Sequence, residues 1–232
     1  MAAGEGLRLR PVTERWPKPI LPIDGRPVLG ALLHELASAR VTRVTVVTGH
    51  LAEQVEAFAG DGAAWGLDLR FARQPRPDGS ADAVARGLEA GALPPLVVTA
   101  ADTLYTAGDL RRFVEAFDAS GADGGLAYRC GHGPSTARPG VRVAGGLVET
   151  VYDLMPGNPF TAAPLWGLGP PLVPYLEGLP GPPYELKDGY QSAIDEGRGV
   201  IGLEIGKTRD LTDTLDLVEE NFPYLAGLEG TT

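Results

Sequence analysis

The first 18 residues combine two glycines with several cationic side chains. Gly4 and Gly6 lie two positions apart, and Arg8 and Lys18 follow them. A glycine-rich turn can aim several backbone N–H groups at one place, where they bind phosphate oxygens. Arginine and lysine are charged donors that suit a polyphosphate. The segment therefore predicts a phosphate-binding loop.

The glycine spacing differs from two common nucleotide-binding motifs. The stretch GEGLRL has no third glycine where a dinucleotide fingerprint requires one, and no Gly-Lys-Ser/Thr follows as in a P-loop. A second chemical group stands at Asp102, which ends the apolar run PPLVVTAAD. Open α/β sheets bind ligands at the carboxyl ends of buried strands, so Asp102 is a candidate site residue.

The elements that must position these groups alternate along the chain. Strands that alternate with helices of 10 to 15 residues predict βαβ units with right-handed crossovers. We therefore expect an α/β fold with an open, mostly parallel, Rossmann-like sheet and helices on both faces. The expected helices are 27–40, 51–60, 80–91 with Ser80 as N-cap, 108–121, 185–197 and about 212–225; the expected strands are 41–50, 67–74, 94–102, 124–130 and 199–206.

Residues 131–184 are rich in proline and glycine and show short strand candidates in GVRVAGGLVETVY. We interpret them as a small irregular and antiparallel insertion that contacts substrate, with a linker as the alternative. We expect a single domain over 1–232. Its parts are a first part (1–130) that carries the predicted phosphate-binding loop, this insertion, and a C-terminal part (185–232) that returns to the sheet.

Composition limits the class of protein. The chain has 232 residues, 44% of them hydrophobic, and a formal net charge of −10. This charge argues against nucleic acid and anionic membranes as partners. A single cysteine, Cys130, excludes an intrachain disulfide, and His34, His50 and His132 are interpreted as surface or packing residues. We expect a cytoplasmic enzyme, with a homo-oligomer possible.

The opening stretch AAGEGLRLRPVTERWPKPILPI resembles the pattern (L)AAGxGTRLxPxTxxxPKxLLPI of the sugar nucleotidyltransferases, the NDP-sugar pyrophosphorylases. The resemblance implies transfer of a nucleoside monophosphate from a nucleoside triphosphate to a sugar 1-phosphate, with release of pyrophosphate. In that reading Ala3, Gly4 and Gly6 cradle the nucleotide phosphates. Arg8 holds and activates them, and Lys18 neutralises charge at the reacting phosphates.

The stretch QPRPDGSADAV at 74–84 resembles the base-recognition loop of the family, in the form typical of glucose-1-phosphate thymidylyltransferases. The resemblance implies that the Gln74 side chain and the Gly79 backbone read a pyrimidine edge, with Ser80 beside them. It therefore favours dTTP or UTP as the nucleotide.

Two aspartates follow from the resemblance as ligands of Mg²⁺. Asp102 matches the family's metal-binding Asp. TRDLTDTLDLVEENFPYL resembles the closing segment of the family and places the second metal Asp at Asp210, with Asp213 as the competing assignment. Magnesium prefers hard oxygen ligands and binds through one or two carboxylates plus substrate phosphates.

The acceptor side departs from the family pattern. Leu7 replaces the usual Thr, Asp153-Leu154-Met155 replaces a Glu-Lys-Pro segment, and FTAAPLW lacks the Asn-x-Gly form. ELKDGYQ keeps Glu185 and Asp188, which the resemblance assigns to the sugar substrate. An acceptor such as phosphocholine, or a non-catalytic sugar-nucleotide sensor, therefore remains an alternative.

Family members begin with an apolar strand before AAG, whereas here Met1 takes the place of its last residue. Loss of a central strand would cost many kcal/mol against a total stability of about 5–15 kcal/mol. Either the native start lies upstream or the sheet is rearranged, and we favour the first.

Overall fold

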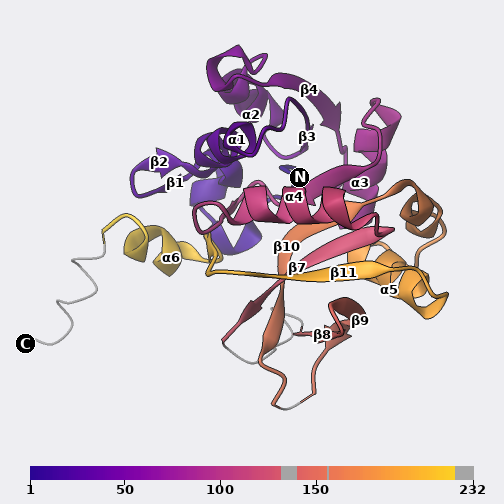
Figure 1. Ribbon diagram of the computed structural model, residues 1–232. Helices are drawn as coiled ribbons and strands as arrows, with labels where there is room; N and C mark the ends of the chain where they lie inside the picture. The colour runs from indigo at the N-terminus through magenta and orange to yellow at the C-terminus, as the bar shows by residue number, and fades with distance from the viewer. Residues whose placement is uncertain (132–139, 156, 223–232) are drawn as a thin grey trace, which may run out of the picture.

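The computed structural model describes residues 1–131, 140–155 and 157–222 (Figure 1). Most expected elements form near their expected positions. The closing helix is shorter than expected, and residues 223–225 of that expectation lie outside the described ones, as does His132. The helices are α1 Val28–Ser38, α2 Ala52–Ala59, α3 Ser80–Glu89, α4 Asp109–Ser120, α5 Leu186–Asp195 and α6 Thr214–Glu219, with short 3-10 turns η1 Leu7–Leu9, η2 Val12–Glu14, η3 Lys18–Ile20, η4 Ala63–Trp65 and η5 Pro170–Leu176.

Twelve strands pair into one large and three small sheets over the described residues. The large sheet has the order β5-β10-β7-β11-β9-β8, and the small sheets are β1-β2, β3-β4 and β6-β12. The strands are β1 Pro22–Ile23, β2 Arg26–Pro27, β3 Arg43–Thr48, β4 Asp68–Arg73, β5 Leu96–Thr99, β6 Thr103–Leu104, β7 Gly124–Cys130, β8 Gly140–Ala144, β9 Leu147–Asp153, β10 Phe160–Leu168, β11 Val200–Ile205 and β12 Arg209–Asp210.

The expectation of an open, mostly parallel sheet is wrong. β10 lies between β5 and β7 and is antiparallel to both, so it interrupts the parallel order at the centre of the sheet. β8 pairs with both β9 and β10, which closes β10, β7, β11, β9 and β8 into a five-stranded barrel. The segment assigned to an insertion thus supplies a central strand.

Pro164 explains why the sequence pattern does not predict β10 as a central strand. A proline inside an apolar run argues against a central strand, because it cannot donate a ladder hydrogen bond. Here the register of β10 against β7 shifts between Ala162 and Trp166, so the proline lies at an irregularity where no such bond is needed. Its carbonyl accepts hydrogen bonds from Ala100 N at 3.2 Å and Tyr105 Oη at 3.0 Å.

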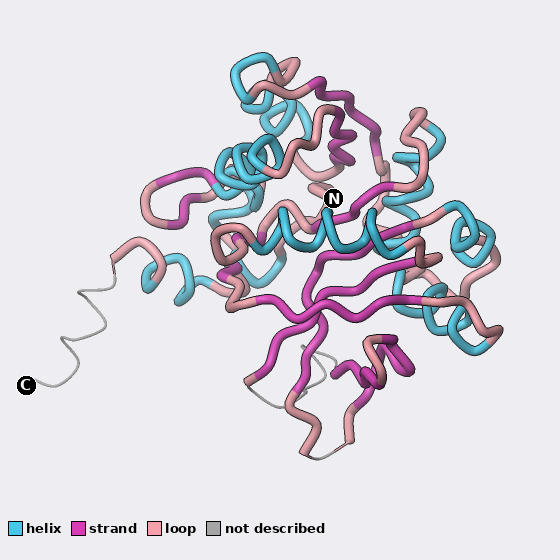
Figure 2. The backbone as a smooth tube through the Cα atoms, in the orientation of Figure 1, coloured by secondary structure: helices cyan, strands magenta, loops and turns pink. Residues whose placement is uncertain are grey.

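Helices cover both faces of the large sheet. α4 crosses β7 and buries Phe113 and Phe117 in the same cluster as Leu165 (Figures 1 and 2). On the opposite face Tyr190 of α5 packs edge-on against Trp166, with ring centroids 4.8 Å apart. No helix of the described residues is long and apolar enough to cross a membrane.

Residues 1–3 lie in the gap between β3 and β5. Ala2 N donates to Val47 O at 2.7 Å, and the Met1 amine donates to Thr99 O at 2.7 Å. Burial lowers the pKa of that amine to about 6. The gap continues as a cavity of about 490 Å³. It is lined by residues 43–47 of β3, by β5 and by leucines of α1.

Filling this cavity should stabilise the protein. We expect that five apolar, mainly β-branched residues added before Met1 pair with β3 and β5. This extension should raise Tm by about 5 °C or more. Each fully buried Val, Leu or Ile adds about 1.5–3 kcal/mol, and 1 kcal/mol shifts Tm by about 2–4 °C in a chain of this size. Thermal unfolding against a Gly/Ser extension of equal length tests this, and equal Tm values would contradict it.

Candidate functional site

The loop after residues 1–3 is braced into a tight turn. Gly6 adopts φ +62°, and a Cβ there would lie 2.9 Å from Thr13 Cγ2, so only glycine fits without strain. Thr13 Oγ1 donates to Gly6 O at 2.9 Å, and the His50 ring lies 2.6 Å from Thr13 O. His50 N also donates to Ala3 O at 3.2 Å, so the residues after β3 hold the loop at both ends.

The loop presents unused donors. Among the described residues, no acceptor pairs with the backbone N–H groups of residues 4–8 or with the Arg8 guanidinium. Gly4 and Arg8 are exposed. Consecutive free N–H groups beside an unpaired cation form an anion-binding turn.

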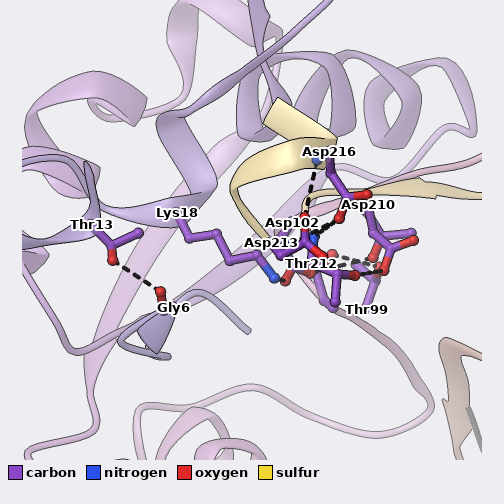
Figure 3. A network of polar contacts seen from close by, with 11 residues as sticks. Gly6, Thr13, Lys18, Thr99, Asp102, Asp210, Thr212, Asp213 and Asp216 are labelled. Atoms are coloured by element: carbon purple, nitrogen blue, oxygen red, sulfur yellow. Dashed lines mark hydrogen bonds and ion pairs between the residues drawn. The ribbon is translucent and has the colours of Figure 1, made fainter. Parts of the chain in front are cut away.

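Lys18 connects this loop to the end of β5. Its Nζ forms an ion pair with Asp102 Oδ2, and both side chains are largely buried, with 19% and 27% of their surfaces exposed (Figure 3). A partly buried ion pair is screened less by solvent than a surface pair, so this contact fixes the relative position of the two segments.

Asp210 reaches the same place from the C-terminal part of the chain. β12 pairs with β6 so that Asp210 lies opposite Thr103, the neighbour of Asp102. Thr212 Oγ1 donates to Asp210 Oδ2 at 3.1 Å (Figure 3). The register therefore places the two predicted metal ligands side by side.

Arg209 anchors this strand. Its guanidinium donates to Asp24 Oδ1 at 2.9 Å and to Glu220 Oε2 at 2.6 Å. These carboxylates raise the pKa of Arg209, and the hydrogen bond from Arg209 lowers the pKa of Asp24. The clamp joins β12 to the β1-β2 hairpin and to α6.

Asp213 is engaged in helix capping. Its side chain accepts from Leu215 N at 2.8 Å and Asp216 N at 3.2 Å, and Asp216 Oδ2 accepts from Asp213 N at 2.9 Å. This capping box begins α6. The geometry therefore favours Asp210 over Asp213 as the second metal ligand, whose role stays a prediction.

A small apolar cluster lies beneath these polar groups. Leu9 of the loop and Leu211, the residue after Asp210, are both buried in it with Ile23. Leu104 of β6 packs against the same cluster. Burial of each such side chain contributes about 1.5–3 kcal/mol, so the cluster holds the loop, β6 and β12 together.

The carboxylates suit a hard cation. No group of three or more His, Cys, Asp or Glu that could hold a metal alone occurs in residues 1–131, 140–155 and 157–222. Asp102 and Asp210 offer two carboxylates, and Mg²⁺ commonly takes its remaining ligands from substrate phosphates and water. The residues therefore fit a magnesium ion that binds together with a polyphosphate.

The predicted base-recognition residues lie between the end of β4 and the start of α3. Gln74 is buried, and its Nε2 donates to Gly79 O at 2.9 Å. Ser80 is not the helix N-cap as expected, because Gly79 takes that position. The Ser80 hydroxyl instead donates to Glu185 Oε2 at 2.5 Å and accepts from Leu186 N at 2.9 Å, which ties α3 to α5. The expected nucleotide and sugar segments thus adjoin one another.

The acceptor side shows how the departures are accommodated. Asp153 is buried and accepts from Met155 N at 2.9 Å and Asn158 Nδ2 at 3.2 Å, while Leu154 and Met155 are exposed. Lys187 Nζ lies 5.4 Å from the centroid of the neighbouring Tyr152 ring and 2.7 Å from Asp188 Oδ1. A cation from α5 therefore lies beside the strand end that lacks a lysine.

Sequence reasoning missed three residues of this region. Thr13 appears only within the opening pattern, His50 is interpreted as a surface or packing residue, and Asp82, whose Oδ2 accepts from Gln74 Nε2 at 2.8 Å, is not among the candidates. Thr13 and His50 act through backbone contacts between distant segments, which spacing does not reveal. For Asp82 a signal existed, since a carboxylate in the first turn after the predicted base loop lies within reach of that loop.

Comparison with known proteins supports a common origin. The family described as "Nucleotidyl transferase" matches residues 1–141. A glucose-1-phosphate thymidylyltransferase from Actinoplanes sp. is 37% identical over 116 residues, covering 50% of this chain and 38% of that protein. The low-salt glycan biosynthesis nucleotidyltransferase Agl11 of Haloferax volcanii is 25% identical over 237 residues, covering 95% and 65%. The matched part of this chain spans less than two thirds of these relatives.

Solved structures show the same fold. A UDP-glucose pyrophosphorylase from Acinetobacter baumanii superimposes with TM-score 0.82 at 17% identity over 99% of this chain and 93% of that one. A putative glucose-1-phosphate thymidylyltransferase from Bacillus anthracis also gives TM-score 0.82, at 21% identity over 100% and 95%. The family match covers more than half of the chain and confirms the resemblance seen in the opening stretch. The chain therefore belongs to the nucleotidyl transferase family.

Proposed function

We propose that this protein transfers a nucleoside monophosphate from UTP or dTTP to a sugar 1-phosphate, with Mg²⁺ as cofactor. The observation that carries the proposal is the meeting of Lys18, Asp102 and Asp210 beside a loop with free N–H donors. Such a group of donors and carboxylates suits a metal-bound triphosphate. The names of the relatives support a sugar 1-phosphate as acceptor.

The reaction is an in-line displacement. A phosphate oxygen of the sugar 1-phosphate forms a bond to the α-phosphorus of the triphosphate, and the bond to the pyrophosphate oxygen breaks. The attacking oxygen is already ionised, so the protein needs no general base. It must instead align two anions and neutralise their charge.

The residues of the site divide these tasks. The N–H groups of residues 4–8 and the Arg8 guanidinium hold the leaving phosphates, where negative charge accumulates. Asp102 and Asp210 hold the metal, and Lys18 donates to an oxygen of the reacting phosphate. Bound Mg²⁺ supplies positive charge that neutralises phosphate oxygens.

Lys18 has to exchange partners in this scheme. Without nucleotide it pairs with Asp102. A phosphate oxygen of the bound nucleotide would replace Asp102 as the partner of the ammonium group, and Asp102 would then be one of the two carboxylates that hold the metal. Because each charge gains a new partner, neither is left buried and unpaired.

The acceptor could also be a different phosphate ester. Leu154 and Met155 stand where the family pattern has a Lys-Pro pair, and both are exposed. The strand end therefore lacks the cation that the family pattern places there. Phosphocholine is therefore the second candidate. We favour the sugar 1-phosphate because Lys187 places a cation beside the same strand.

The reaction itself is tested by pyrophosphate release. We expect release from UTP or dTTP with glucose 1-phosphate and Mg²⁺, faster than from CTP, ATP or GTP. Asp210→Asn should lower kcat by about 100-fold or more, because a metal ligand is lost. Asp213→Asn is the matched control and should keep activity, because Asn caps helices about as well as Asp.

Three outcomes are decisive in that assay. Equal loss in both Asp variants would contradict the assignment of Asp210. Release that requires phosphocholine would select the second acceptor. A folded protein that releases no pyrophosphate with any triphosphate would contradict the enzyme and favour a sensor.

Lys187 should act on the acceptor alone. We expect Lys187→Met to raise KM for the sugar 1-phosphate by about tenfold, since a charged hydrogen bond contributes about 1.5–3 kcal/mol, and to leave KM for the nucleotide unchanged. Initial-rate kinetics with each substrate varied in turn measures both constants. A rise in the nucleotide KM, or no change in either constant, would contradict this role.

A further inference from the structure

We propose that Asp82 sets the base preference of the site by fixing which end of the Gln74 amide faces the nucleotide base. This inference rests on the proposed function, because it assumes that a nucleotide binds beside α3. Asp82 acts through Gln74 and is therefore a positioning residue.

The hydrogen bonds of Gln74 determine the orientation of its amide. Gln74 Nε2 lies 2.9 Å from Gly79 O and 2.8 Å from Asp82 Oδ2. A carbonyl and a carboxylate only accept hydrogen bonds, so both require the NH₂ end of the amide. The opposite end, Oε1, has no donor among the described residues and is left as an acceptor.

Asp82 is itself held in place. Its side chain is 14% exposed, and Oδ1 accepts from Arg86 Nη2 at 3.0 Å, one turn further along α3. The nearby Asp82 charge raises the pKa of Arg86. With one oxygen on Arg86 and the other on Gln74, the carboxylate cannot turn away. The carboxylate thus prevents the Gln74 amide from reversing.

A free donor belongs to Gly79, whose carbonyl oxygen contacts Gln74 Nε2. No described residue accepts from Gly79 N–H. The Gly79 backbone is fixed, because a Cβ would lie 2.2 Å from Tyr184 O and Ala81 N donates to that same oxygen at 2.9 Å. The Gln74 side chain and the Gly79 backbone therefore offer one acceptor and one donor, each held in place by its neighbours.

This pair complements uracil and thymine rather than cytosine. Uracil and thymine present a donor at N3–H beside carbonyl acceptors, whereas cytosine presents an acceptor at N3 beside an amino donor. With Oε1 facing the base, cytosine would place two acceptors against each other. Leaving such groups unpaired beside the buried Gln74 costs about 1–3 kcal/mol.

Asp82→Asn tests the inference. The Asn side chain can donate to Gln74 Oε1, so only the neutral Gly79 carbonyl still favours the NH₂ end at this position. The reversed amide, which presents its NH₂ group to the base, then becomes populated. We expect the wild-type protein to bind UMP at least about tenfold more tightly than CMP, and the variant to lose about tenfold or more of that ratio, the value of one hydrogen bond. Titration calorimetry with UMP and CMP measures this without catalysis.

Glu89→Gln is the matched control. Glu89 pairs with the same Arg86 at 3.0 Å, whereas the hydrogen bonds of Gln74 Nε2 go to Gly79 and Asp82, so the Glu89 variant should keep the wild-type ratio. Circular dichroism and Tm establish that each variant is folded. If Asp82→Asn does not fold, Asp82→Ala replaces it, because it removes the charged and therefore stronger of the two acceptors that hold the NH₂ end.

The outcomes separate the inference from the proposed function. A folded Asp82 variant with an unchanged UMP-to-CMP ratio, or a Glu89→Gln protein with the same loss, would overturn the inference alone. A folded wild-type protein that binds neither nucleotide would overturn the proposed function and the inference with it.

Discussion

The ion pair between Lys18 and Asp102 is the contact on which the site depends. It joins the loop of residues 3–18 to the end of β5, two segments separated by more than 80 residues of sequence. The buried cluster around Leu9 and Leu211 supports it from below and brings β12 to the same edge. The ion pair and the buried cluster thus hold the same three segments together. Their arrangement determines where the loop and the two carboxylates lie, and therefore where the phosphates are expected to bind.

The sequence predicted the local elements of the fold better than their arrangement. Helices and strands up to residue 130 lie close to their expected bounds, because amphipathic and β-branched runs are local signals. The predicted open, mostly parallel sheet was wrong, because the strand order depends on β10, where Pro164 interrupts an apolar run. Pairing between strands that are far apart in the chain leaves no periodic pattern in the sequence. The barrel could therefore be recognised only from the structure.

For the site, the same division applies. The opening pattern identified Lys18, the end of an apolar run identified Asp102, and the closing segment identified Asp210. The structure brings Lys18 and Asp102 into contact, and the β6-β12 register brings Asp210 beside Asp102. Spacing alone did not separate Asp210 from Asp213, since that choice depends on which carboxylate caps α6. The position of Asp82 in the first turn after the base loop indicates that it lies near that loop, but not which atom of Gln74 it contacts. Hydrogen-bond direction is a property of packing rather than of residue type.

The most direct test is a crystal structure with Mg²⁺ and a non-hydrolysable UTP analogue. The account predicts a cation bound by Asp102 and Asp210, with Lys18 Nζ moved from Asp102 to a phosphate oxygen and the loop N–H groups on the leaving phosphates. A nucleotide bound elsewhere, with the Lys18 to Asp102 ion pair intact, would contradict it. So would a metal held by Asp213 instead of Asp210.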